Sequence, residues 1–238
     1  MRIALIGYGK MGKAIESIAL AKGHEVVLKI DLDNGHEMTA ENLRTADVAI
    51  EFTGPASAAA NLLACARAGI RTVSGSTGWL EQLEAVKKAF EQNASAFLYA
   101  SNFSIGVNIF LEINKRLASL MAPHSEYAVE MLEIHHTQKK DAPSGTAITL
   151  AEQVMKEIPS LTSWVNRPAE KPAELPVLSK RLDPAPGTHE VRYHSVVDDI
   201  VIIHTAHNRE GFANGAVLAA EYICDKKGIF SMKDVLGF

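Results

Sequence analysis

The sequence has 238 residues, 47% hydrophobic and 22% charged, which are the values of a globular chain of one to two domains. Its 24 Lys and Arg residues and 28 Asp and Glu residues give a net charge of −4, so it lacks the basic surface that nucleic-acid binding requires. Cys65 and Cys224 supply neither a disulfide framework nor a closed zinc site, and no apolar run approaches the ~20 residues of a membrane span, so we expect a cytoplasmic protein with no membrane partner.

The N-terminal part of the chain alternates between short apolar runs and helical patterns, punctuated by glycine. The pattern predicts strands at 2–6, 25–30, 49–53, 70–74 and 96–100, and helices at 11–22, 56–68 and 79–92. Alternating strands and helices with short connections are typical of a parallel, doubly wound sheet. We therefore predict an α/β fold of Rossmann type, with a dinucleotide-binding domain over residues 1–104.

The pattern after residue 104 is that of an α+β domain, which we place at residues 105–208. It predicts helices at 105–121 and 145–157, a strand at 126–136, an irregular excursion at 159–187, and a hairpin of strands at 189–196 and 199–206. A last helix, at about 212–225, falls in a third segment, 209–238, and by its pattern alone belongs to either domain.

The first strand leads into a glycine loop of the form G-x-G-x-x-G, which consists of Gly7, Tyr8, Gly9, Lys10, Met11 and Gly12. The loop lies at a strand-to-helix turn, and Asp31 ends the second strand about 20 residues later, as in the dinucleotide-binding fingerprint. In that fingerprint the first glycine permits the turn, the second lets a pyrophosphate approach, and the third lets the helix pack on the strand. The helix N-terminus then binds the phosphates, and Asp31 binds the adenosine ribose.

Two other interpretations of this loop remain open. The glycines could serve only a tight turn, with Asp31 as a solvated strand end. Residues 7–13 also read G-x-x-x-x-G-K, the phosphate-binding loop of nucleotide hydrolases, but Ala14 stands where that motif requires a Ser or Thr to hold Mg²⁺.

The cofactor preference depends on charge at the end of the second strand. Asp31 accepts a ribose hydroxyl but repels the 2′-phosphate of NADPH, and Leu32 stands where an NADP site usually has an arginine. Lys10 and Lys29 are the nearby cations. We therefore predict that NADH is the cofactor and that NADPH is used more weakly.

A second group of polar residues follows the strand at 126–136. His135 and His136 end this strand, Lys139 and Lys140 follow, and a Gly-Thr pair opens the next helix. Histidine is the usual proton-transfer residue near neutral pH, and a helix N-terminus beside cations can hold a carboxylate. The pattern therefore predicts an anion pocket with proton-transfer groups.

This second group also has other interpretations. Taken singly, its residues are an ordinary strand end, a solvated loop and a turn. A metal site formed by His135, His136, His204 and His207 is another possibility, although adjacent histidines on a strand diverge. We predict no metal.

Residues 135–147 read H-H-T-Q-K-K-D-A-P-S-G-T-A, which resembles the H-H-x-x-K-x-D-A-P-S-G-T-A signature of the 4-hydroxy-tetrahydrodipicolinate (dihydrodipicolinate) reductase family. Residues 7–12 are similar to the first loop of the family. Residues 75–78 resemble its G-T-T-G loop, with Ser76 for the first Thr, and residues 100–104 resemble its A-x-N-F-S segment. Residues 212–216, after Arg209, resemble its closing motif, so the resemblance runs over nearly the whole chain.

The resemblance implies a homotetrameric enzyme that reduces 4-hydroxy-tetrahydrodipicolinate on the diaminopimelate route to lysine. It implies that His135 and Lys139 transfer protons and that His136, Gly145 and Thr146 bind the substrate, a small dicarboxylate. It implies that the cofactor is bound by residues 7–12 and by Asp31, Gly75, Ser76, Thr77, Ala100, Ser101, Asn102 and Phe103. It further implies that the second domain builds the oligomer contact and that the C-terminal helix returns to the dinucleotide-binding domain.

The chain departs from the family at the adenosine end of the cofactor. Leu32 and Gly54 stand where members that use NADPH well carry arginines, which supports the preference for NADH. The chain is also short for the family, and we expect the loop at 34–44 to be trimmed. Two rival functions remain: another nicotinamide-dependent enzyme such as an amino-acid dehydrogenase, and a redox-sensing regulator, for which the sequence shows no basic DNA-binding helix.

Overall fold

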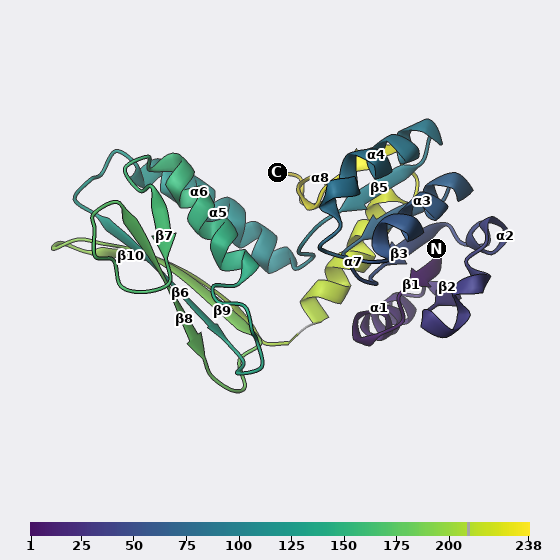
Figure 1. Cartoon of the computed structure of the whole chain (residues 1–238), viewed down its shortest axis with the longest axis horizontal. Helices are drawn as coiled ribbons and strands as arrows, with labels where there is room; N and C mark the ends of the chain where they lie inside the picture. Colours follow the sequence, from purple (N-terminus) through teal and green to yellow (C-terminus); the bar gives the residue numbers. More distant parts are fainter. Residues whose placement is uncertain (209) are drawn as a thin grey trace. The chain divides into compact units, whose positions relative to one another are not determined.

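The structure is a computed structural model that describes residues 1–208 and 210–238 (Figure 1). Arg209, which precedes the closing motif, lies outside the described residues. The chain divides into two compact units, here called unit 1 (Met1–Ile105 with Glu210–Phe238) and unit 2 (Gly106–Arg209). The predicted boundaries differ from these by a single residue, and the C-terminal segment belongs to unit 1.

Unit 1 contains a six-stranded sheet in the order β11-β5-β4-β3-β1-β2, and each neighbouring pair is parallel. Its strands are β1 (Arg2–Ile6), β2 (Glu25–Ile30), β3 (Val48–Glu51), β4 (Arg71–Ser74), β5 (Ala96–Tyr99) and β11 (Gly228–Phe230). The first strand of the chain, β1, lies inside the sheet, with β2 on one side and β3, β4, β5 and β11 on the other. This confirms the predicted doubly wound α/β fold.

Helices cover both faces of this sheet. Because side chains alternate along a strand, Ile3 and Leu5 pack with α1 (Lys10–Ala21) and α7 (Glu210–Ile223) on one face. Ala4 and Ile6 pack with α3 (Ala58–Ala68) and α4 (Leu83–Gln92) on the other. The short elements are η1 (Leu32–Glu37), α2 (Ala40–Leu43), η2 (Leu80–Gln82) and α8 (Met232–Leu236).

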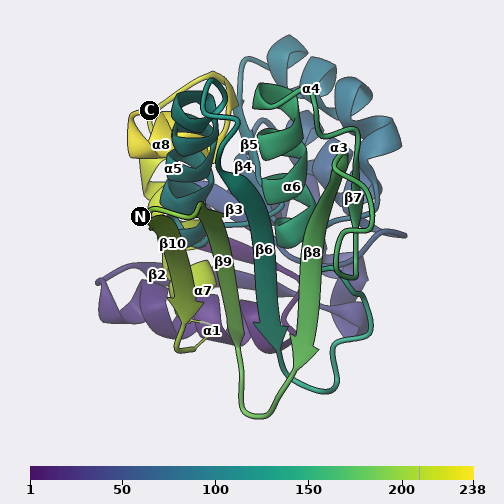
Figure 2. The same ribbon diagram turned by 90° about the vertical axis from the view of Figure 1, so that its left-hand side faces the viewer.

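Unit 2 contains a mixed sheet in the order β10-β9-β6-β8-β7, with α5 (Ile105–Met121) and α6 (Gly145–Glu157) packed against one face (Figure 2). Its strands are β6 (Ala128–His135), β7 (Ser163–Val165), β8 (Glu174–Arg181), β9 (Gly187–His194) and β10 (Asp199–Ala206). Among the residues that the structure describes, no helix has both the length and the apolar character needed to cross a membrane.

One prediction about local structure was wrong. Residues 159–187 are not one irregular excursion, because they contain β7 and β8; β8 pairs in parallel with β6, and Leu175 and Val177 enter the core. The prolines and charged residues of this segment do not give the alternating pattern of a strand. Strand β8 is stabilised by its pairing with β6, which is distant in the sequence. The helix predicted at 79–92 is present as η2 followed by α4, and residues 34–44 contain the end of η1 and the whole of α2.

Candidate active site

The glycine loop connects β1 to α1, and its glycines have different surroundings. A Cβ atom at Gly7 would lie 2.1 Å from the carbonyl oxygen of Phe52, and Gly7 has a φ of 92°. A Cβ atom at Gly12 would lie 2.3 Å from the carbonyl oxygen of Gly7, so only glycine lets the helix come this close to the strand. Apart from its chain neighbours, none of the described residues has an atom within 4 Å of the Cβ position of Gly9, which is the N-cap of α1. The loop therefore leaves open space where a pyrophosphate would contact the first N–H groups of the helix.

The predicted cofactor residues gather at one edge of the sheet of unit 1. The glycine loop follows β1, Asp31 follows β2, residues 75–77 follow β4, and residues 100–103 follow β5. Because these strands are parallel, all four segments lie at the carboxyl edge of the sheet. The strands β2 and β3 flank β1 on opposite sides, so this edge includes the topological switch point, where doubly wound sheets bind dinucleotides.

The end of this edge that follows β2 carries a carboxylate, and no arginine occupies the adjacent position. Asp31 is exposed; its carboxylate accepts a hydrogen bond from the backbone N–H of Leu32 at 3.0 Å and caps η1. The side chain of Leu32 is 98% exposed. The ammonium of Lys29 lies 2.5 Å from the carboxylate of Glu16, which also accepts a hydrogen bond from the Tyr8 hydroxyl. The charge of Lys29 is therefore already balanced.

A buried carboxylate that the sequence analysis missed supports the loop after β4. Glu51 is the last residue of β3 and is fully buried. It accepts hydrogen bonds from the hydroxyls of Ser74 at 2.6 Å and Ser76 at 2.8 Å, and from the backbone N–H of Thr53 at 3.0 Å. The side chain of Ser76 is thus directed into the protein, whereas Thr77 is exposed. The sequence did contain a signal for Glu51, because it is a single charged residue at the end of an otherwise apolar strand.

The segment after β5, which was predicted to contact the cofactor, also packs into the core. Phe103 is buried, and its ring centroid lies 5.5 Å from that of Phe52. A Cβ atom at Gly215 would lie 1.7 Å from the carbonyl oxygen of Phe103, so Gly215 lets α7 pack directly on this segment. Asn102 accepts a hydrogen bond from the backbone N–H of Ser104 at 2.9 Å, and Ser101 is exposed.

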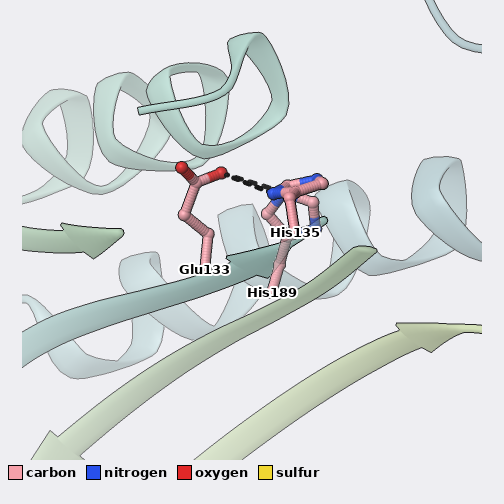
Figure 3. Close-up of side chains that lie close together, drawn as sticks. All are labelled: Glu133, His135 and His189. Atoms are coloured by element: carbon pink, nitrogen blue, oxygen red, sulfur yellow. Dashed lines mark ion pairs between the residues drawn. The ribbon is translucent and has the colours of Figure 1, made fainter. Parts of the chain in front are cut away.

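The second group of predicted residues lies in unit 2, around the end of β6 (Figure 3). Glu133 and His135 are two residues apart on this strand and therefore share its buried face. His135 Nδ1 lies 3.1 Å from Glu133 Oε2, close enough for an ion pair but not aligned as a linear hydrogen bond. His189, on β9, places its ring 5.2 Å from that of His135.

Glu133 connects the strand to the start of α6. The backbone N–H of Ser144 lies 3.1 Å from both of its carboxylate oxygens. Ser144 is the N-cap of α6: its hydroxyl accepts from the backbone N–H of Ala147 and lies 3.1 Å from His189 Nε2. Gly145 and Thr146 follow in the first turn, where backbone N–H groups have no acceptor within the helix. Outside the neighbouring backbone of α6 itself, the described residues place no atom within 4 Å of the Cβ position of Gly145.

Burial and hydrogen bonding set the ionisation of this cluster. Burial by itself raises the pKa of Glu133, but contacts from His135, Ser144, Ser179 and Arg181 outweigh it and hold the pKa well below its usual range. Burial, together with the nearby His135, lowers the pKa of His189 to about 4. At neutral pH, Glu133 is therefore a carboxylate and His189 is a neutral imidazole.

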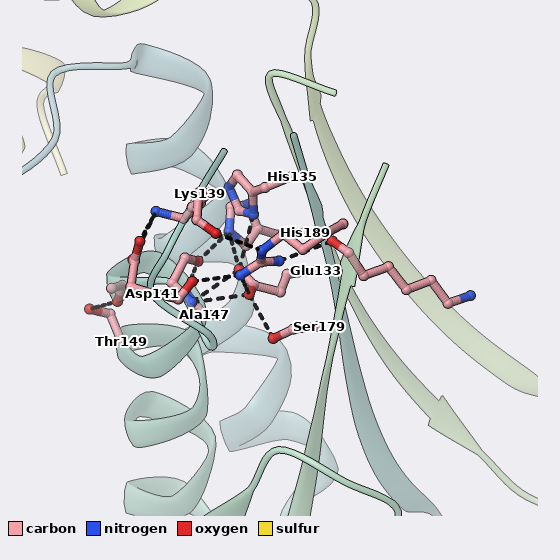
Figure 4. Close-up of polar contacts among 12 residues, drawn as sticks. Glu133, His135, Lys139, Asp141, Ala147, Thr149, Ser179 and His189 are labelled. Carbon is pink, nitrogen blue, oxygen red and sulfur yellow. Dashed lines mark hydrogen bonds and ion pairs between the residues drawn. The ribbon is translucent and has the colours of Figure 1, made fainter. Parts of the chain in front are cut away.

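The loop between β6 and α6 is attached to the end of β8 (Figure 4). Arg181 Nη2 donates to the carbonyl oxygen of Asp141 at 2.6 Å and lies 3.1 Å from Glu133 Oε1. The ammonium of Lys139 lies 2.8 Å from both carboxylate oxygens of Asp141. Thr137 donates its backbone N–H and its hydroxyl to Asp183. The loop that carries Lys139 is thus held in place by the strand that the sequence analysis missed.

The structure brings together most of the residues predicted for the second site. These residues lie in or beside the loop between β6 and α6. The loop follows His135, begins with His136, carries Lys139, and leads to Gly145 and Thr146 at the start of α6. Glu133, Ser144, Arg181 and His189 join them and were not predicted; Glu133 was visible in the sequence only as a charge inside a strand of alternating pattern.

Glu133, His135 and His189 also have the spacing of metal ligands, with donor atoms within 4.8 Å of one another. Within the described residues, His136, His204 and His207 are not part of this group, unlike the alternative considered above. The guanidinium of Arg181 lies 3.1 Å from the same carboxylate, and a second cation there would be repelled. The charge of Arg181 therefore disfavours a metal ion in this cluster.

Comparison with known proteins identifies the family. A family model described as "Dihydrodipicolinate reductase, N-terminus" matches residues 1–103, and one described as "Dihydrodipicolinate reductase, C-terminus" matches residues 106–236. The chain belongs to the dihydrodipicolinate reductase family. The predicted family is thereby confirmed.

Relatives and solved structures agree with this assignment. The 4-hydroxy-tetrahydrodipicolinate reductase of Christiangramia forsetii is 48% identical over 99% of this chain and 98% of its own length. The enzyme of the same name from Methanosarcina barkeri is 35% identical over 97% of this chain and 83% of its own. The dipicolinate-bound dihydrodipicolinate reductase of Paenisporosarcina sp. TG-14 has a TM-score of 0.77 and 25% identity, with 97% of each chain covered.

Proposed function

We propose that this chain catalyses the NAD(P)H-dependent reduction of 4-hydroxy-tetrahydrodipicolinate to tetrahydrodipicolinate, on the diaminopimelate route to lysine. The observation that carries the proposal is the proton-transfer cluster around His135 next to the open N-terminus of α6, in a chain that also has a dinucleotide-binding loop. The activity is the one named for the curated relatives. Unit 1 would bind the cofactor and unit 2 the substrate.

The residues of unit 2 suit a dianionic substrate. The first-turn N–H groups of Gly145 and Thr146, together with His136, would hold one carboxylate, because a helix N-terminus attracts anions. His135 and Lys139 would supply and remove protons while the ring is reduced and its 4-hydroxyl group leaves as water. The ammonium of Lys139 is bound by Asp141 in this structure, and a substrate carboxylate would compete with Asp141 for it.

The glycine loop, Asp31 and the segments after β4 and β5 would hold the nicotinamide cofactor, which supplies the hydride. Open space at Gly9 fits a pyrophosphate, and the exposed carboxylate of Asp31 fits ribose hydroxyls. The absence of an arginine at Leu32 or Gly54 supports a preference for NADH over NADPH.

We further propose that unit 2 forms a homotetramer, as the resemblance implies, in a cytoplasmic enzyme. On the sheet face opposite α5 and α6, the pairing register aligns Leu178, Leu132, Glu190 and Ile203 in one row across β8, β6, β9 and β10, and three of these four side chains are apolar. Ile203 is 57% exposed and its neighbour Val201 is 42% exposed. Apolar side chains on an uncovered sheet face favour a second copy of the chain as partner. Light scattering should give a tetramer mass, and Ile203→Asp should reduce it; a monomeric wild type would refute the proposal.

The activity is tested in a coupled assay. The purified chain is added to the product that the preceding synthase makes, and the loss of NADH absorbance is followed. Rapid oxidation that depends on the synthase product supports the reductase. Oxidation with simple imines or oxo acids and ammonia, but not with the synthase product, would instead identify an amino-acid or imine reductase on the same scaffold.

A further inference from the structure

We propose that Glu133 is a positioning residue of this active site, which holds the imidazole of His135 in the tautomer that leaves Nε2 as the proton-exchanging atom. The inference rests on the proposed role of His135 in proton transfer. Glu133 is fully buried on β6, and its Oε2 atom lies 3.1 Å from His135 Nδ1. Loose alignment of such a contact is common in ligand-free enzymes and tightens when substrate binds.

The partners of Glu133 fix which of its oxygens faces the histidine. Its Oε1 atom accepts from the Ser179 hydroxyl at 2.7 Å and from Arg181 Nη2 at 3.1 Å. Both donors are on β8, and they hold this oxygen on the side of that strand. Oε2 is thereby directed toward His135, and the backbone N–H of Ser144 bridges both oxygens.

The tautomer of His135 follows from the charge of Glu133. An ionised carboxylate can only accept hydrogen bonds, so the imidazole must present an N–H at Nδ1. The low pKa of Glu133 keeps the carboxylate ionised through the neutral range. When Nε2 takes up a proton, the carboxylate also stabilises the resulting imidazolium.

His189 does not compete for the same carboxylate oxygen. Its Nε2 atom lies 3.9 Å from Glu133 Oε2 but 3.1 Å from the Ser144 hydroxyl. That hydroxyl accepts from Ala147 N–H, so its own proton is available to His189 Nε2. Glu133 Oε2 is therefore available to His135. Glu133 also contacts the backbone of Ser144, the N-cap residue of α6, which is the helix proposed to bind the substrate carboxylate.

The direct test is the tautomer of His135 in the wild-type protein, measured by ¹⁵N–¹H correlation spectra of the histidine side chains at alkaline pH. His135→Gln identifies the signals by their disappearance. The proposal requires the Nδ1–H tautomer; an Nε2–H tautomer would overturn it. This measurement needs no substrate, so it succeeds or fails independently of the proposed reductase activity.

The variant test uses Glu133→Gln, which preserves the shape of the side chain. Ser179 and Arg181 would hold the amide oxygen, and the amide NH₂ would face His135 Nδ1 and impose the Nε2–H tautomer. We expect kcat to fall by about 10²- to 10⁴-fold with the Kd for NADH unchanged. A folded Glu133→Gln protein with a near-normal kcat would contradict the proposal.

Glu130→Gln is the matched control. It makes the same substitution on the same strand, but on the opposite face of β6, where Glu130 pairs with Arg192, so the His135 tautomer and kcat should be unchanged. If Glu133 had only a structural role, Glu133→Gln would lower stability without changing the tautomer.

Discussion

The Nε2 atom of His135 lies 3.0 Å from the position that a Cβ atom at Gly187 would occupy. Gly187 begins β9 and pairs with Ala206 of β10, so its place beside the imidazole is fixed by the sheet. The ring of His135 thus has a carboxylate at Nδ1 and a residue without a side chain beside Nε2. This glycine keeps the second nitrogen accessible to a ligand.

Substitution of this glycine should therefore block proton transfer. In Gly187→Ala the new methyl group would lie against Nε2, and we expect kcat to fall at least about tenfold while the Kd for NADH stays constant. Gly23→Ala is the control, because Gly23 also has a positive φ but no atom near its Cβ position. It should cost stability without lowering kcat. An active Gly187→Ala enzyme would show that another atom exchanges the proton.

The two proton-transfer residues should be separable from cofactor binding. His135→Ala and Lys139→Ala should each lower kcat by about 10²- to 10⁴-fold, the usual contribution of a general acid or base. Neither residue is part of the glycine loop, so the Kd for NADH, measured by fluorescence titration, should not change. Near-normal kcat in both variants would remove them from the mechanism.

Substrate anchoring by α6 is tested with Thr146→Val, which keeps the size of the side chain but removes the hydroxyl. We expect KM for the substrate to rise, with the Kd for NADH unchanged. Thr149→Val is the control: its hydroxyl donates to the carbonyl oxygen of Gly145 from one turn further along the helix, and its loss should leave KM unaltered. Equal KM values in all three proteins would mean that Thr146 only begins the helix.

The cofactor preference should reverse when the charges after β2 are exchanged. The wild type should use NADH better than NADPH by at least several-fold, since a like-charge contact costs about 1–3 kcal/mol. Asp31→Ser combined with Leu32→Arg should favour NADPH, because the repulsion is removed and a phosphate partner is added. Lys29→Ala should leave the ratio of kcat/KM values unchanged, since Glu16 already pairs with Lys29. Equal use of both cofactors by the wild type would place Asp31 away from the ribose.

The buried histidine of β9 should make unit 2 sensitive to acid. The pKa of His189 is lowered to about 4 from an ordinary 6.5, so between these values the unfolded chain binds more protons than the folded one. Stability therefore falls as pH falls through this window, by up to about 3 kcal/mol from this residue.

The measurement is urea unfolding followed at Trp164 in a Trp79→Phe background, which reports on unit 2 alone. His189→Gln should lose less stability than its parent between neutral pH and about pH 4. His124→Gln, at an exposed histidine, should not differ from the parent. The same acid sensitivity in all three proteins would assign the effect to other groups.

The cofactor edge was predictable from the sequence because its signals are local. The run at 2–6, the glycine loop and Asp31 lie within a single strand-helix-strand unit, and parallel strands necessarily bring their ends to one edge. The exception is Ser76, whose side chain is turned inward by Glu51, a residue of the neighbouring strand. Which way that serine points depends on strand order, which the local pattern does not contain.

The sequence by itself determined the doubly wound fold and the glycine loop, because periodicity and motif spacing express them directly. Only the tertiary structure decided what surrounds His135. Arg181 comes from a strand hidden among prolines and charges, and His189 comes from β9. They reach Glu133 through strand pairing between segments more than 40 residues apart. Such pairing is stabilised by burial on a shared sheet face, and no local pattern records which distant strand will supply that face.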